Sequence, residues 1–105
     1  MNTPDSLSRL TLVFPPMLEE RLVALLLDHE PPLPGFTVLP AEGHGADFGR
    51  ASVRERVRGR VARRLLTVVL PTAQAGPLIE SLRQQVHSGE TAWWLEGVQQ
   101  FGRLA

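Results

Sequence analysis

The sequence of 105 residues contains no cysteine, no lysine and no tyrosine, and Asn2 is its only asparagine. The lack of cysteine excludes disulfides, thiolate metal sites and a cysteine nucleophile. The lack of lysine excludes Schiff-base chemistry, so the basic side chains other than histidine are guanidiniums, which bind carboxylates and phosphates but do not act as general bases. No nucleophile, base and orienting group can be recognised together, and we therefore expect a protein that is not an enzyme.

Long apolar runs are also missing, and nothing in the sequence approaches the roughly 20 apolar residues of a membrane span. The first residues lack the apolar core of a signal peptide. We therefore expect a cytoplasmic protein that is not inserted in a membrane. The length supports one domain over residues 1–105, in which the polar residues 1–8 are expected to fray.

The charge is balanced overall but unevenly distributed. The formal net charge is zero, yet seven arginines and one glutamate lie between Arg50 and Arg64. In an extended chain, arginines at alternate positions from Arg54 to Arg60 project from one face. Such a row either protects a solvated strand edge or forms a surface for an anion or an acidic partner. Because the whole chain is neutral, no nucleic-acid partner is expected.

The anion-binding interpretation names specific residues. Its anchors lie where the basic row rejoins the apolar core, and one arginine near the C-terminus is expected to face the same cleft. These arginines are Arg58, Arg60, Arg63, Arg64 and Arg103.

Hydrophobic periodicity predicts strands separated by two helices. The predicted helices run from Met17 to His29 and from an N-cap at Thr72 to Ser88-Gly89. A short helical turn over Ser52–Val57 remains open. The predicted strands are Arg9–Phe14, Phe36–Leu39, a long third strand that continues the basic row through Leu65–Leu70 and is buried on both faces, and two short strands, Thr91–Leu95 and Val98–Phe101. This order predicts an α+β fold, ferredoxin-like βαββαβ with a short extra C-terminal strand.

Several classes of protein share this fold, so functional residues must distinguish them. An RNA-recognition module stacks bases on exposed aromatic side chains of its central strands, and the third strand has none. An acylphosphatase uses an internal asparagine, and a metallochaperone of this fold uses paired cysteines. The chain has no cysteine, and its only asparagine, Asn2, is at the N-terminus.

The remaining pattern resembles the PII superfamily of regulatory proteins. The resemblance rests on the motif LPGFTV at Leu33–Val38, the glycine spacing of GHGADFG at Gly43–Gly49, and the order of elements after Val57. The basic run Ser52–Arg60 is similar to that of small PII-like proteins of proteobacteria, which are often encoded beside heavy-metal efflux pumps.

The resemblance implies a homotrimeric sensor with ligand clefts between subunits. Residues 42–57 correspond to the family's mobile T-loop, which reports to a protein target, and the resemblance points to a membrane efflux pump as that target. The implied ligand site contains Gly43, Gly45 and Asp47 beside the arginines. However, PII proteins have a glutamine where Asp47 stands, and the phosphate-binding loop after the second helix is here His87–Thr91, with one glycine and with Glu90. The effector therefore stays open among an anion, a nucleotide and a metal ion.

Two further groups of residues carry hypotheses. His44, with Glu42 and Asp47 nearby, is either an exposed loop histidine or part of a histidine–carboxylate metal site, which hard and borderline cations accept. A metal site would suit an alternative function, a small trimeric metal-binding protein of the copper-tolerance type. Trp93 and Trp94 point to opposite faces of a strand, so we expect one in the core and the other at a subunit interface.

Overall fold

The computed structural model describes residues 6–45 and 60–105. The predictions for Asp47, for Arg58 and for the segment Ser52–Val57 therefore lie outside the described residues. The described chain contains a single sheet of β1 (Leu7–Phe14), β2 (Phe36–Gly43), β3 (Val61–Pro71) and β4 (Ala92–Val98), in the spatial order β2-β3-β1-β4 with every neighbouring pair antiparallel. This is the ferredoxin-like order, and the predicted α+β fold class is confirmed.

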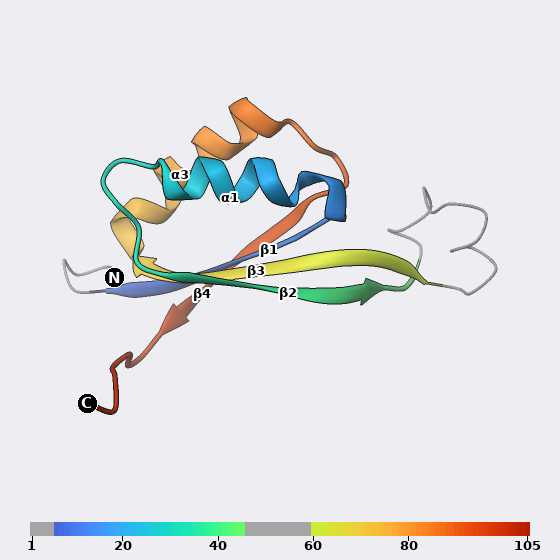
Figure 1. Cartoon of the computed structure of the whole chain (residues 1–105). Helices are drawn as coiled ribbons and strands as arrows, with labels where there is room; N and C mark the ends of the chain where they lie inside the picture. Colours follow the sequence, from blue (N-terminus) through green and yellow to red (C-terminus); the bar gives the residue numbers. More distant parts are fainter. Residues whose placement is uncertain (1–5, 46–59) are drawn as a thin grey trace.

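Two helices cover one face of this sheet (Figure 1). A 3₁₀ turn, η1 (Pro16–Leu18), leads into α1 (Glu19–Leu27), and α3 spans Thr72–Val86. Pro16 is tolerated in the first turn because the amide proton it lacks would have no partner within the helix. Within residues 6–45 and 60–105, no helix combines the length and apolarity that a membrane crossing requires.

The hydrophobic core lies between the sheet and the helices. Alternation along β1 and β3 brings one set of side chains from each strand towards the helices, where they meet the apolar stripes of α1 and α3. The largest fully buried side chains of this core cluster are Leu10, Phe14, Leu22, Leu26, Leu66, Val68, Leu70 and Leu78. This layer holds the four strands in register and so sets the points at which the chain leaves and re-enters the sheet.

The prediction that Leu65–Leu70 is buried on both faces is wrong. Leu66, Val68 and Leu70 are buried beneath the helices. Leu65, Thr67 and Val69, which point to the other face, are only half-buried. The face of the sheet opposite the helices, here called the open face, is not covered by any described helix (Figure 1). Antiparallel sheets commonly have one face without a second layer.

Several predicted boundaries need correction. β1 begins at Leu7 and Ser8 is 6% exposed, so the expectation of fraying fails for residues 6–8. Thr72 is not an N-cap: it is the first residue of α3, and its hydroxyl pairs with that of Ser8 at 2.8 Å. β2 continues beyond Leu39 to Gly43 because it is an edge strand, in which Pro40 needs no ladder partner on its outer side.

Only the first of the two predicted final strands is formed, and it runs beyond its predicted end to Val98. The dipeptide Glu96-Gly97 does not form a turn. It continues β4, with Glu96 paired to Arg9 and Gly97 paired to Ser8. The chain after Val98 contains no further strand, so the extra C-terminal strand is not formed, and the tail runs away from the sheet (Figure 1).

Candidate functional site

The segment expected to act as a mobile loop leaves and re-enters the sheet at one point. Gly43, the last residue of β2, is paired with Val61, the first residue of β3. Glu42 and Gly43 therefore belong to the sheet and not to the loop, which begins at His44. Gly45 has a φ of 103°, a backbone conformation that glycine adopts without steric cost and that a larger residue rarely adopts. The backbone conformation at position 45 thus explains why a glycine is found there.

Three other parts of the chain meet at the same end of the sheet. β1 ends at Phe14, which pairs with Arg64, and β4 begins at Ala92, which pairs with Val13. The loop 87–91 therefore lies at the same end of the sheet as the base of the segment that follows Gly43. We call this end, with its arginines, the loop-base site.

The arginines of the loop-base site do not form one row. Arg63 and Arg64 are consecutive in β3 and so project from opposite faces of the sheet. On the helix face, Arg64 Nε donates to Glu19 Oε1 at 2.8 Å. Arg60, just before β3, donates from Nη1 to Glu42 Oε1 at 3.0 Å.

Arg63 differs from the other two because it is only 7% exposed. Its Nη2 lies 3.7 Å from Glu90 Oε2, and its Nη1 donates to the carbonyl oxygen of Ala62 at 2.8 Å. In the sequence, Glu90 was notable only as a departure from a phosphate-binding loop. In the structure it partly neutralises a buried guanidinium, which reduces the cost of desolvating that charge. An anion at this site must therefore compete with carboxylates already in place.

Arg103 is not brought to this site within one chain. It lies in the tail beyond β4, whose last residue, Val98, pairs with Leu7 at the opposite end of the sheet. Arg103 could therefore reach the predicted cleft only in another subunit, and its role there stays a prediction.

The predicted metal ligands are only partly described. His44 Nε2 lies 3.8 Å from Glu42 Oε2, while the other oxygen of Glu42 accepts the hydrogen bond from Arg60. No group of three or more potential ligands is found in residues 6–45 and 60–105. The third proposed ligand, Asp47, lies outside these ranges.

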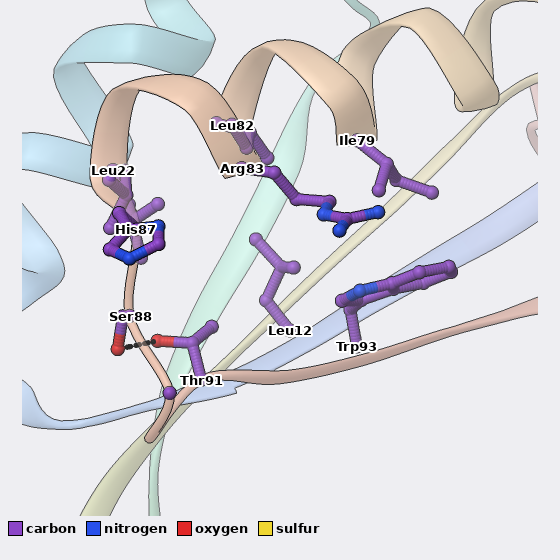
Figure 2. Close-up of a pocket in the computed structure, with 11 residues that line it drawn as sticks. Leu12, Leu22, Ile79, Leu82, Arg83, His87, Ser88, Thr91 and Trp93 are labelled. Carbon is purple, nitrogen blue, oxygen red and sulfur yellow. Dashed lines mark hydrogen bonds between the residues drawn. The ribbon is translucent and has the colours of Figure 1, made fainter.

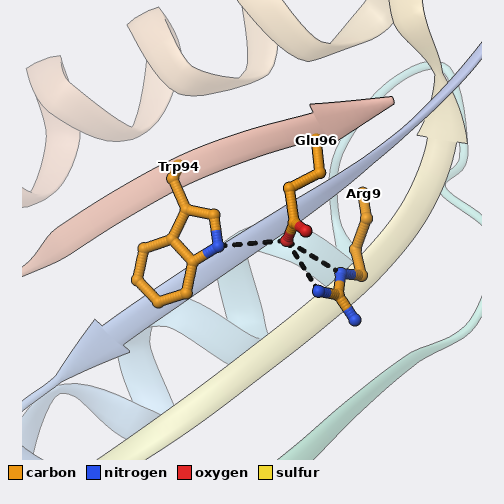
Figure 3. A network of polar contacts seen from close by, with 3 residues as sticks. All are labelled: Arg9, Trp94 and Glu96. Carbon is orange, nitrogen blue, oxygen red and sulfur yellow. Dashed lines mark hydrogen bonds and ion pairs between the residues drawn. The ribbon is translucent and has the colours of Figure 1, made fainter. Parts of the chain in front are cut away.

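A polar network on the open face was not predicted from the sequence. Arg9 on β1 donates to Glu96 Oε1 on β4 from Nη2 at 2.6 Å and from Nε at 3.2 Å, and the indole Nε1 of Trp94 donates to the same oxygen at 3.1 Å (Figure 3). The hydrogen bond from Arg9 lowers the pKa of the Glu96 carboxyl below its ordinary value, and the bond from Trp94 lowers it further against the effect of desolvation. The cross-strand pairing of Arg9 with Glu96 explains why Glu96 continues the strand.

We expect this network to make stability depend on pH in the acid range. Because the folded-state pKa of Glu96 is lowered, its contribution is present above the ordinary value of 4.5 and is lost as the pH falls through the folded-state pKa. The melting temperature of Glu96→Gln should therefore lie below that of the wild type at pH 7 and approach it at acid pH. The matched control is Glu80→Gln, because the Glu80 carboxylate lies 3.9 Å from Arg83 on an exposed helix face. If the difference in melting temperature between wild type and Glu96→Gln does not change with pH, the lowered pKa of Glu96 does not contribute to stability.

Neither tryptophan is buried in the core. Trp93 projects to the helix side of the sheet and is 44% exposed, while Trp94 projects to the open face and is also partly exposed. The prediction that one of them is core is wrong, because β4 is an edge strand and the helices do not extend over it fully. The prediction of an interface tryptophan stays untested.

Comparison with known proteins agrees with this architecture. The family described as "Protein of unknown function (DUF3240)" matches residues 5–105. A crystal structure of a DUF3240 family protein from Shewanella baltica is similar at a TM-score of 0.75 and 19% identity, covering 94% of this chain and 97% of that chain. The PII-like protein CPII from Thiomonas intermedia, bound to ADP, AMP and bicarbonate, is similar at a TM-score of 0.68 and 20% identity, covering 95% and 97%. The GlnK–ATP complex of Bacillus subtilis gives a TM-score of 0.65 at 16% identity, covering 90% and 85%.

The fold is thus that of the PII-like proteins, as the resemblance in the sequence implied. The chain belongs to the DUF3240 family. No curated protein matches the chain.

Proposed function

We propose that this chain is a non-enzymatic regulatory protein that assembles as a homotrimer and binds a small anionic effector at the clefts between subunits. The effector would bind at the loop-base site and change the order of residues 44–57, which would report to a protein target. Adenine nucleotides are the first candidates for the effector. A link to heavy-metal efflux, and a membrane efflux pump as the target, are part of the proposal through the sequence resemblance alone.

The observation that carries the proposal is the convergence at one end of the sheet. Arg60, Arg63 and Arg64 surround the point where the segment after Gly43 leaves the sheet, and the loop 87–91 lies at the same end. Guanidiniums bind phosphates and carboxylates with directed hydrogen bonds. A ligand that displaced Glu42 or Glu90 from its arginine would also alter the base of the segment that follows Gly43.

Assembly is supported by the composition of the open face. In one row across the sheet, Leu39, Leu65 and Val13 are neighbours, and Leu39 is 42% exposed. A partly exposed apolar row of this kind on a small domain favours contact with another chain. A homotrimer would cover it and would create the clefts that the proposal requires.

Proteins of the same fold support the choice of effector. CPII from Thiomonas intermedia is bound to ADP, AMP and bicarbonate, and GlnK from Bacillus subtilis is bound to ATP. Both bind anions of the class that arginines recognise. These ligands belong to those proteins, and they define the first compounds to test here.

We expect at least one of ATP, ADP, AMP and bicarbonate to raise the melting temperature in a thermal-shift assay. A ligand that binds only the folded protein adds about 2.7 kcal/mol of stability at a concentration of 100 times Kd. Arg60→Gln should reduce the shift because it removes the most accessible guanidinium of the loop-base site, whereas Arg83→Gln, on the exposed face of α3, should leave it unchanged. If none of the four compounds shifts the melting temperature, the nucleotide proposal is wrong.

The alternative, a small trimeric metal-binding protein, rests on fewer of the described residues. Glu42 and His44 are close, but Glu42 is already bonded to Arg60. A site of useful affinity needs further ligands, and the candidate, Asp47, lies outside the described ranges. The metal hypothesis thus stays a prediction and ranks second.

A further inference from the structure

A cavity whose lining includes none of the loop-base arginines lies on the helix side of the sheet. It is enclosed by the last turns of α3, the loop that follows them and the edge strand β4, and has a volume of about 310 Å³ (Figure 2). Small-molecule sites in proteins have volumes of roughly 300–1,000 Å³ and combine apolar walls with a few polar groups. The cavity is therefore large enough for a small organic molecule.

The interior of this cavity is apolar. Leu12 from β1, Leu82 and Val86 from α3 and the ring of Trp93 from β4 line it. Trp93 is 44% exposed because nothing in the described chain covers its outer side. An apolar ligand would remove this indole surface from water, at roughly 25 cal/mol for each Å² of apolar area buried. The body of the ligand should thus be a hydrocarbon chain or a ring.

The rim of the cavity carries cationic and hydroxyl groups. Arg83 projects from α3 towards Trp93 across the opening, and His87 lies at the other end beside Ser88 and Thr91 (Figure 2). Thr91 donates its hydroxyl hydrogen to Ser88 Oγ at 2.9 Å. These groups provide hydrogen-bond donors next to an apolar interior.

The nearby carboxylates leave the guanidinium at the rim available to a ligand. Glu80 does not line the cavity and contacts Arg83 only at 3.9 Å on an exposed surface, where such a pair is weak. Glu90 lies in the loop beside the cavity but contacts the buried Arg63 instead. The guanidinium of Arg83 is thus able to exchange Glu80 for the carboxylate of a ligand.

We propose that this cavity binds an amphipathic monocarboxylate, with its apolar body against Leu82 and Trp93 and its carboxylate at Arg83. The cavity shares the loop 87–91 with the loop-base site but none of its arginines, and its ligand goes beyond the proposed function. The ligand class follows from an apolar interior with a single guanidinium at the opening. A dianionic or strongly hydrated ligand would leave polar groups unpaired against the leucines.

The test uses Trp93 as the reporter in a Trp94→Phe background, which leaves one tryptophan in the chain. Titration with octanoate should shift and quench the Trp93 emission and reach saturation. Octanol should bind about two- to fivefold more weakly, the ratio expected for the loss of one exposed ion pair. Octylamine should bind more weakly still because its charge repels Arg83.

Variants in the same background separate the contributions. Arg83→Gln should weaken octanoate binding about two- to fivefold, and Glu80→Gln, which removes the competitor, should strengthen it. Arg9→Gln, on the open face of the sheet, removes the same charge as Arg83→Gln but does not line the cavity, and it should leave the affinity unchanged. Val86→Phe should fill the cavity and abolish saturation, with circular dichroism to verify folding. If it does not fold, the opposite effects of Arg83→Gln and Glu80→Gln still decide the question.

The proposal is overturned if octanoate produces no saturable change in Trp93 emission, or if octanol binds as tightly as octanoate. It is also overturned if dilution of the protein, and not octanoate, changes the emission. In that case a second copy of the chain covers the cavity.

Discussion

Leu39→Glu is expected to convert the proposed homotrimer into monomers. Leu39 is 42% exposed on the open face, so the folded monomer should accept the carboxylate without loss of its core. In an assembly that covers this face, the same charge would be buried without a partner, at a cost of several kcal/mol for each subunit. Light scattering coupled to size-exclusion chromatography should show a fall in mass of about threefold.

The matched control is Leu27→Glu. Leu27 is 72% exposed on α1, in the layer on the other side of the sheet, and receives the same substitution. It should remain trimeric. If both variants keep the wild-type mass, the open face is not the assembly surface, and if the wild type is itself a monomer, the proposed clefts do not exist.

Leu26→Ala is expected to destabilise the fold by about 3–5 kcal/mol. Leu26 is 1% exposed and packs in the core beneath α1, and buried leucine-to-alanine substitutions cost this much because they remove apolar contacts and leave a cavity. The neighbouring residue provides the control. Leu27→Ala makes the same change at the next position of the same helix, on its exposed side, and should cost less than about 0.5 kcal/mol.

Urea unfolding at a fixed protein concentration measures both values, since the stability of an assembly depends on concentration. Equal costs for the two leucines would mean that α1 does not present Leu26 to the core. A large cost for Leu27→Ala alone would place the exposed side of α1 in an interface.

The order of elements could be predicted from the sequence because apolar periodicity determines it. The alternation in β1 and β3 and the helical spacing of Leu22 and Leu26 each match a buried surface in the structure. The failures occurred where pairing between distant residues overrode a local signal. Glu96-Gly97 has the composition of a turn, but Arg9, 87 residues earlier, bonds Glu96 and holds it in the strand.

For the candidate site, the residue types were informative and their partners were not. The concentration of arginines before β3 was visible in the sequence. That Arg64 pairs with Glu19 across 45 residues, and that Arg63 is buried next to Glu90, depends on which strands meet at one end of the sheet. The cavity between α3 and β4 had no sequence signal, because its apolar lining has the same periodicity as ordinary core.

Because Gly43 pairs with Val61, the fold does not depend on how many residues lie between them in the segment 44–60. Opposite residues in an antiparallel ladder lie about 4.5–5.5 Å apart, so the two ends of that segment are joined by the sheet itself. Closing a longer loop between fixed ends costs only about 0.6 kcal/mol for each doubling of its length. Related chains can therefore come to recognise different partners by inserting or deleting residues in this segment, while β2 and β3 keep their register.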